Sequence, residues 1–172
     1  LLRRRCRRVW TRDEETREEL RRAGVEALFR GNPIMDLAIP REAEAPSPWE
    51  GASGRRVLLL PGSRQQAYDD AGLLLEVARR LHEEEPTRFV LVPAPTLDLE
   101  RLVAHRGLWI WDPGTSRLRL RSGPEDLEVR VFPGPLAVAA RGAEVLLGLG
   151  GTANQVCAGL GVPVVSLDDR GK

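Results

Sequence analysis

The sequence predicts an α/β fold: a three-layer sandwich in which a mainly parallel sheet of five or six strands lies between helices. Two observations predict it. Beyond residue 54, short apolar runs typical of buried strands alternate with segments whose apolar residues recur at helical spacing. Two of these runs end in glycine-containing turns that lead into a helix. A chain of 172 residues can bury about two-thirds of its unfolded surface, enough for one real core.

The part of the chain before residue 40 reads as strand, helix, strand. The strand-like runs are Cys6–Trp10 and Val25–Arg30. Between them, Thr11 or Asp13 can cap a helix that continues to Ala23, with acidic residues in its first turn and arginines in its later turns. The helix dipole favours this order of charges.

The remaining elements follow in regular alternation. The spacing of Ala67, Ala71, Leu74, Ala78 and Leu81 predicts a long helix. The expected strands are Arg56–Leu60, Phe89–Val92, Leu108–Trp111, Arg117–Arg121, Leu127–Phe132, Val145–Leu147 and Val162–Leu167. The other expected helices are Leu99–Arg106, Leu136–Ala143 and Thr152–Leu160. Two of the strand-like runs alternate with period two, which predicts an added hairpin near residues 117–131.

We divide the chain into three parts. Residues 1–39 are interpreted as the tail of one domain, and residues 55–172 as a second domain. Residues 40–54 are rich in Pro, Ala, Ser, Glu and Gly, which is typical of a linker. The chain begins with Leu1 rather than Met and stops soon after a strand-like run, so we interpret it as a piece of a longer protein.

Composition excludes several classes of function. The 26 basic and 25 acidic residues nearly balance, so the chain is no polycation, and we expect no nucleic-acid partner. Lys172 is the only lysine, which rules out a phosphate site that needs an interior ammonium group. No Asp-x-Asp motif and no His or Cys cluster has metal-ligand spacing, so we expect neither metal nor other cofactor. Two distant cysteines and the lack of a long apolar run predict a cytoplasmic location.

Two loops carry the residues expected to bind a ligand. Ligands of open parallel sheets bind beyond the carboxyl ends of the strands. The loop Pro61–Arg64 offers there a glycine that lets a ligand approach the backbone, a serine hydroxyl and a planar cation. The loop 148–152 runs into a helix N-terminus, whose N–H groups and positive dipole end suit an anion. The candidate residues are Gly62, Ser63, Arg64, Gly150, Gly151, Thr152, Ala153, Asn154 and Gln155.

The apolar residues of the helix after the second loop have the spacing of a core-facing stripe. Thr152, Asn154 and Gln155 lie off this stripe, so we expect them to face the ligand. Thr152 is expected to act either as the N-cap of the helix or as a phosphate contact. Together the two loops predict a site for a nucleotide-like anion.

Several motifs resemble a known family and occur in its order. They are Gly31–Asp36, Leu59–Arg64, Gly151–Gln155 and Gly159–Val164. They resemble the second half of lipid-A-disaccharide synthase and, more closely, of the lipid-A-disaccharide synthase-related proteins. The resemblance implies a glycosyltransferase of the two-domain GT-B fold, of which this chain would be mainly the C-terminal, Rossmann-like donor domain.

The resemblance also implies roles for particular residues. The donor would be a nucleotide sugar, with a UDP-sugar as the first choice, and the acceptor a lipid-linked or other glycan. Ser63, Arg64 and the helix start at Gly151-Thr152 would contact the diphosphate, and residues 152–155 would reach phosphate and ribose. Asn32 and Asp36 would lie on the interdomain or acceptor side. The general base is expected in the other domain, so we assign no catalytic residue and expect no activity from this piece alone.

Other interpretations stay open. The chain could be a nucleotide-sugar binding module without activity, or an isomerase of the UDP-sugar 2-epimerase type. Family members often carry a glutamate shortly after Gly-Thr-Ala, where this chain has Gln155 and Val156. The arginines between Arg3 and Arg12, which no acid balances, could be a surface uncovered from preceding chain or a contact with anionic lipid at the inner membrane face. A homodimer is a further open alternative.

Overall fold

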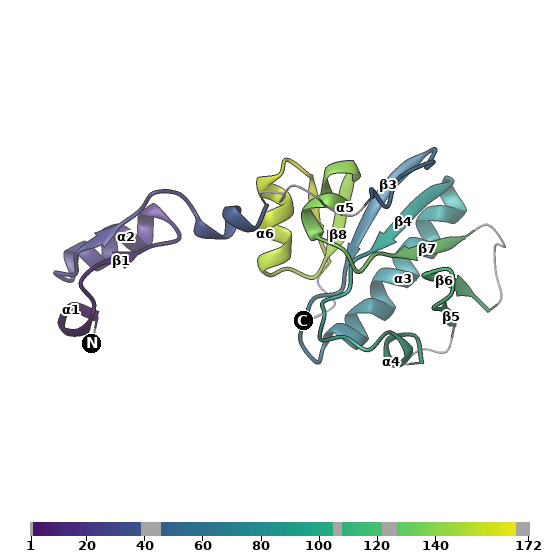
Figure 1. Cartoon of the computed structure of the whole chain (residues 1–172), viewed down its shortest axis with the longest axis horizontal. Helices are drawn as coiled ribbons and strands as arrows, with labels where there is room; N and C mark the ends of the chain where they lie inside the picture. The colour runs from purple at the N-terminus through teal and green to yellow at the C-terminus, as the bar shows by residue number, and fades with distance from the viewer. Residues whose placement is uncertain (1, 39–45, 105–107, 122–126, 168–172) are drawn as a thin grey trace. The chain divides into compact units, whose positions relative to one another are not determined.

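The computed structural model describes residues 2–38, 46–104, 108–121 and 127–167 (Figure 1). The chain divides into two compact units, Leu1–Ile39 and Pro40–Lys172. Each unit has a sheet of its own. Within the described ranges, no helix is both long enough and apolar enough to cross a bilayer.

The first unit has the predicted succession of strand, helix and strand. Its elements are α1 (Leu2–Arg5), β1 (Val9–Trp10), α2 (Glu14–Arg22), β2 (Ala27–Leu28) and the 3-10 helix η1 (Pro33–Ala38). The two short strands pair in parallel. Asp13 is the cap of α2, because its carboxylate accepts a hydrogen bond of 2.8 Å from the Thr16 N–H. Hydrogen bonding to the side chain and to the N–H of Thr16 lowers the pKa of Asp13. Thr11 is instead buried, and its hydroxyl donates to the Leu28 carbonyl at 3.2 Å.

The second unit is built on a seven-stranded sheet in the order β5-β6-β7-β4-β3-β8-β9. Its strands are β3 (Arg55–Leu60), β4 (Thr87–Leu91), β5 (Trp109–Asp112), β6 (Arg117–Leu120), β7 (Glu128–Val131), β8 (Val145–Gly148) and β9 (Val164–Ser166). The five strands from β7 to β9 are parallel, while β5 and β6 are antiparallel to their neighbours. Our expectation of five or six strands was too low, because the two strands of the predicted hairpin (β6 and β7) and the strand before them (β5) all join this one sheet.

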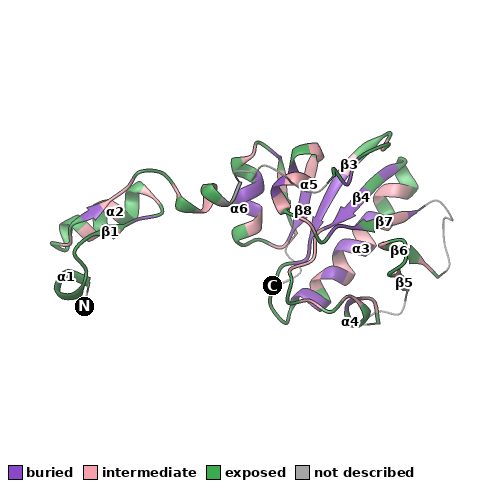
Figure 2. Cartoon of the chain, in the orientation of Figure 1, coloured by how far each residue is buried: buried purple, intermediate pink, exposed green. Residues whose placement is uncertain are grey.

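Helices cover both faces of the sheet. Successive residues of a strand point to opposite faces, so Leu59 lies in one core and Leu58 and Leu60 in another. The first core is closed by α3 (Ala67–Glu84) and α4 (Leu99–Ala104), and the second by α5 (Leu136–Gly142) and α6 (Thr152–Gly159). Figure 2 shows the burial concentrated on the central strands. The architecture is the predicted three-layer α/β sandwich with a mostly parallel sheet, and it is compatible with a Rossmann-like fold.

Part of the segment predicted as a linker packs into the second unit. Trp49 is buried in the core beneath α5, and its indole N–H donates to the Ala139 carbonyl at 2.6 Å. A side-chain carbon at Gly142 would overlap the Trp49 ring, so glycine leaves the space that the indole fills. The Arg130 guanidinium also donates to the Pro48 carbonyl at 2.8 Å. Residues 48 and 49 therefore belong to the core of the second unit.

We predict that Trp49→Ala lowers the free energy of unfolding of this unit by about 3–5 kcal/mol, because it leaves a large cavity and an unpaired Ala139 carbonyl. Trp49→Phe should cost less, since it removes the hydrogen bond and keeps most of the apolar contact. The exposed Trp10 of the other unit is the control, and Trp10→Ala should change stability by less than about 0.5 kcal/mol. Denaturant unfolding followed by far-ultraviolet circular dichroism measures all three; an unchanged Trp49→Ala midpoint would contradict the assignment.

Candidate functional site

The strand order of the second unit reverses at β3: the strands that follow it in the chain first add on one side of β3 and then, from β8 on, on the other side. From β3 the chain passes through α3 to β4 and later reaches β7, all on one side of β3. Helix α5 then carries it back to β8 on the other side of β3. Helices α3 and α6, which follow these two neighbouring strands, lie on opposite faces of the sheet. In open parallel sheets a ligand crevice is expected at such a point, between the loops that follow the two strands. Leu60 and Gly148 are register partners, so both loops start side by side.

The loop after β3 presents an exposed cation at this edge. Gly62 has a φ of +92°, a backbone conformation that favours glycine, and Gly62, Ser63 and Arg64 are all exposed. Arg64 makes no ion pair with any residue in the described part of the chain. The hydroxyl of Thr96, in the loop after β4, donates to the Ser63 carbonyl at 3.4 Å. The loop thus keeps the Arg64 guanidinium available to a ligand.

The loop after β8 ends in an uncapped helix N-terminus. Gly150 and Gly151 have φ values of +95° and +103°, and Gly151 is the N-cap of α6 without any side-chain cap. Thr152 is the first helical residue and is exposed, so the alternative in which it caps α6 is wrong. The first turn of α6 contains no acidic residue. Its N–H groups and positive dipole end are therefore open to an anion.

The other helix that starts at this edge has a different electrostatic character. The first turn of α3 carries Asp69 and Asp70, and its N-cap Gln66 makes no side-chain capping bond. The two helix starts therefore differ: acidic residues lie in the first turn of α3, and none lies in the first turn of α6, which is the more suitable of the two for an anion.

Asn154 has an unexpected position. We expected it to lie off the core stripe of α6, but its side chain is buried, with only 7% exposed. Its amide lies against Gly148, where a side-chain carbon would be 2.6 Å from Asn154 Oδ1. Among the described residues, neither Oδ1 nor Nδ2 has a hydrogen-bond partner, an arrangement that costs about 1–3 kcal/mol for a buried polar group. The amide is therefore an unsatisfied polar group in the interior, where β8 meets the start of α6.

The other predicted site residues of the second unit differ in how far they are exposed. Thr152 and Gln155 are exposed as expected, and Ala153 is half-buried. Ser166 is a rim residue that the sequence analysis missed: it is exposed at the end of β9, is the register partner of Gly148, and its hydroxyl lies 4.0 Å from the position of a side-chain carbon at Gly150. Its signal was the polar residue that ends the apolar run 162–165.

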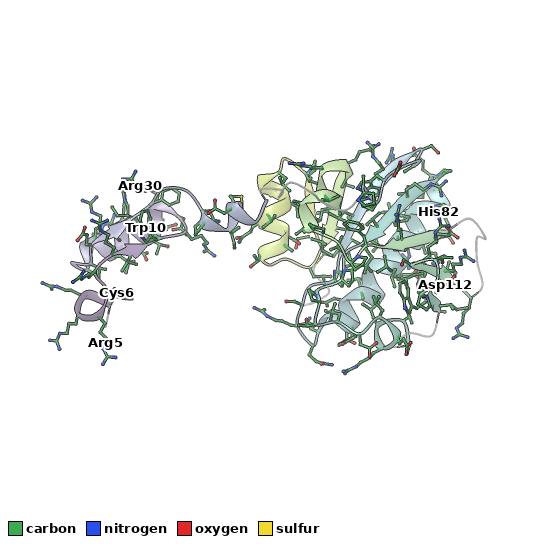
Figure 3. All side chains as sticks on the ribbon, in the orientation of Figure 1. Arg5, Cys6, Trp10, Arg30, His82 and Asp112 are labelled. Atoms are coloured by element: carbon green, nitrogen blue, oxygen red, sulfur yellow. The ribbon has the colours of Figure 1, made fainter. Side chains whose placement is uncertain are left out.

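The predicted site residues of the first unit are Asn32 and Asp36. Asn32 is half-buried, and its Oδ1 accepts a hydrogen bond of 3.1 Å from the Ile34 N–H, which is a turn-forming role. Asp36 is exposed on η1. The arginine-rich segment projects into solvent, as Arg5 does in Figure 3. Our statement that no acid balances it is wrong for Arg12, which pairs with Asp13 at 3.3 Å.

Other groups with reactive chemistry do not gather at the crevice. Cys157 is buried in the core beneath α6, and burial raises the pKa of its thiol to about 11. It is therefore a protonated core residue at neutral pH. Among the residues that the structure describes, no three His, Cys, Asp or Glu side chains form a group that could hold a metal ion.

Neither the comparison with protein families nor that with curated proteins finds a relative. The sequence matches no protein-family model, and no curated protein matches it significantly. The resemblance to the lipid-A-disaccharide synthase-related proteins consequently depends on its motifs, of which Leu59–Arg64 and Gly151–Gln155 flank the crevice.

We predict that Asn154→Leu leaves the ligand-free protein as stable as before or stabilises it by up to about 1–3 kcal/mol, because it replaces an unsatisfied buried amide by an apolar group of similar size. Thermal unfolding of the ligand-free protein measures this effect. Marked destabilisation of the ligand-free variant would show that the amide has a partner within the fold.

We predict that a maleimide labels Cys6 of the native protein at pH 8, where Cys157 stays unlabelled, because only Cys6 is exposed. The folded pKa of Cys157 is raised above its ordinary value of 9.0 to about 11. Its contribution to stability is therefore complete below pH 9 and is lost as the pH rises toward 11. Mass spectrometry of the labelled peptides, with urea-unfolded protein as control, checks the first statement; rapid native labelling of Cys157 would contradict it.

Proposed function

We propose that the second unit binds the diphosphate of a nucleotide sugar, with a UDP-sugar as the first choice, in the crevice between Pro61–Arg64 and Gly148–Thr152. The observation that supports this most is the parallel pairing of β3 with β8 at Leu60 and Gly148, which starts both loops from one edge. The unit would then be the donor half of a GT-B glycosyltransferase resembling lipid-A-disaccharide synthase. Hexosyl transfer would proceed to a lipid-linked or other glycan acceptor.

Electrostatics support a diphosphate as the ligand. The planar guanidinium of Arg64 can hold two phosphate oxygens at once, and the N-terminus of α6 offers backbone N–H groups to another. In a displacement at the anomeric carbon, negative charge grows on the departing diphosphate. A fixed cation and a helix N-terminus stabilise that charge most where it is largest, and so favour the transition state. Inversion at the anomeric carbon follows if the acceptor attacks from the opposite side.

The exposed glycines and polar groups around the crevice support a ligand longer than a single phosphate. Gly150 and Gly151 leave the backbone uncovered, so a ligand can approach it closely. Thr152 and Gln155 can donate to oxygens beyond the diphosphate, and Ser166 adds a hydroxyl from β9.

We predict that UDP and UDP-sugars bind the chain, whereas GDP and ADP bind more weakly, in isothermal titration calorimetry. Arg64→Ala should weaken UDP binding by about tenfold to a hundredfold, since a hydrogen bond to a charged group is worth about 1.5–3 kcal/mol. The matched control is Arg88→Ala, because Arg88 is an exposed arginine near the amino end of β4, away from the crevice.

The outcomes separate the proposal from its alternatives. Loss of UDP binding in Arg64→Ala but not in Arg88→Ala supports the diphosphate site. Equal indifference of the protein to all four nucleotides, or equal effects of the two substitutions, contradicts it. UDP binding without release of UDP from the donor in the presence of a glycan acceptor would favour a binding module.

A further inference from the structure

The edge strand β5 is an open end of the seven-stranded sheet. It pairs with β6 on one side, and no strand within the described residues pairs with its other side. Large apolar side chains are exposed along it: Leu108 is 54% exposed and Ile110 is 45% exposed. A free edge with apolar side chains is a template for pairing with another strand.

The hydrogen-bond pattern shows which backbone groups of β5 are free. The Arg121 N–H donates to the Leu108 carbonyl at 2.9 Å, so Leu108 and Arg121 form a hydrogen-bonded pair. Hydrogen-bonded and non-bonded pairs alternate along antiparallel strands. The backbone groups of Ile110 therefore point to β6, and those of Trp109 and Trp111 point to the free edge.

The sequence of β5 suits pairing with itself. Trp109-Ile110-Trp111 reads the same in both directions. We propose that β5 pairs with β5 of a second copy of the chain, antiparallel, about a two-fold axis at Ile110. In this register Ile110 faces Ile110 of the partner subunit as a non-hydrogen-bonded pair. The backbone of Trp109 exchanges hydrogen bonds with Trp111 of the partner subunit, and the reverse, which uses all the free groups of both tryptophans.

Side chains on both faces of the sheet are compatible with this register. Trp109 and Trp111 lie on the face covered by α3 and α4, so the junction joins aromatic side chains across the axis. Ile110 lies on the opposite face, where its register partner is Arg119 of β6. The Arg119 side chains of the two subunits would be separated by three strand spacings, about 14 Å, a distance at which salt screens their repulsion.

The opposite edge of the sheet offers no comparable match. Strand β9 has only three residues, Val-Val-Ser, and pairs no large side chain with itself. Val165 is nevertheless as exposed as Ile110, at 45%. It therefore provides a control for any effect of adding charge to an exposed edge strand.

Sedimentation equilibrium of the whole chain over a range of concentrations tests the proposal. A junction of one strand is smaller than a standard interface, so we expect a reversible dimer with a dissociation constant in roughly the micromolar range. Ile110→Lys places like charges directly opposite each other on the axis and should weaken association at least about tenfold. Val165→Lys should associate like the parent chain. A chain that stays monomeric throughout, or a dimer weakened by Val165→Lys but not by Ile110→Lys, would overturn the proposal.

A cysteine on the axis tests the register independently of charge. In a Cys6→Ser background, Ile110→Cys should form a disulfide-linked dimer under mild oxidation. Cα atoms of a non-hydrogen-bonded pair are about 4.5 Å apart, within the range that a disulfide spans. Val165→Cys in the same background should stay mostly monomeric on non-reducing gels. Equal cross-linking at both positions would indicate random collision and would refute the two-fold junction.

Discussion

The pairing of β3 with β8 is the constraint on which the candidate site depends. These strands are neighbours in the sheet, although their register partners Leu58 and Leu146 are 88 positions apart in the chain, and the helices that follow them lie on opposite faces. The backbone ladder aligns Leu60 with Gly148 and so brings two distant loops to one edge. Without this alignment Arg64 and the N-terminus of α6 would be unrelated features of the surface. With it, the loop that carries Arg64 and the loop that leads into α6 start side by side at one edge of the sheet.

Two glycines, which lack a side chain, make room for larger side chains in the second unit. Gly142 leaves room for the Trp49 indole, which ties the segment before β3 to α5. Gly148 leaves room for the Asn154 amide, which is buried and has no hydrogen-bond partner among the described residues. The first case satisfies a hydrogen bond and stabilises the fold. The second leaves polar groups unsatisfied near the N-terminus of α6, at a local cost to stability.

The two proposals use different boundaries of the same sheet. The crevice lies at the carboxyl ends of the parallel strands, where loops and helix starts supply polar groups. The proposed subunit junction runs along the side of β5, where the sheet has become antiparallel and backbone groups are free. Because the proposed ligand contacts lie at the carboxyl ends of the strands and the proposed subunit contacts lie along β5, one surface can be altered while the other stays intact.

Local sequence patterns were sufficient to predict most helices and strands, but not which of these elements lie beside one another. Periodicity identified α3 and the buried strands, and Asp13 was one of the two predicted caps, because each of these features depends on neighbours within a few residues. Motif and loop chemistry named Arg64 and Gly151 as ligand contacts, which stays a prediction. Strand order, the burial of Asn154 and the docking of Trp49 depend on contacts between residues far apart in the chain. Apolar spacing shows which side of an element faces a core, but it carries no information on which strand lies beside it or where a distant glycine leaves space.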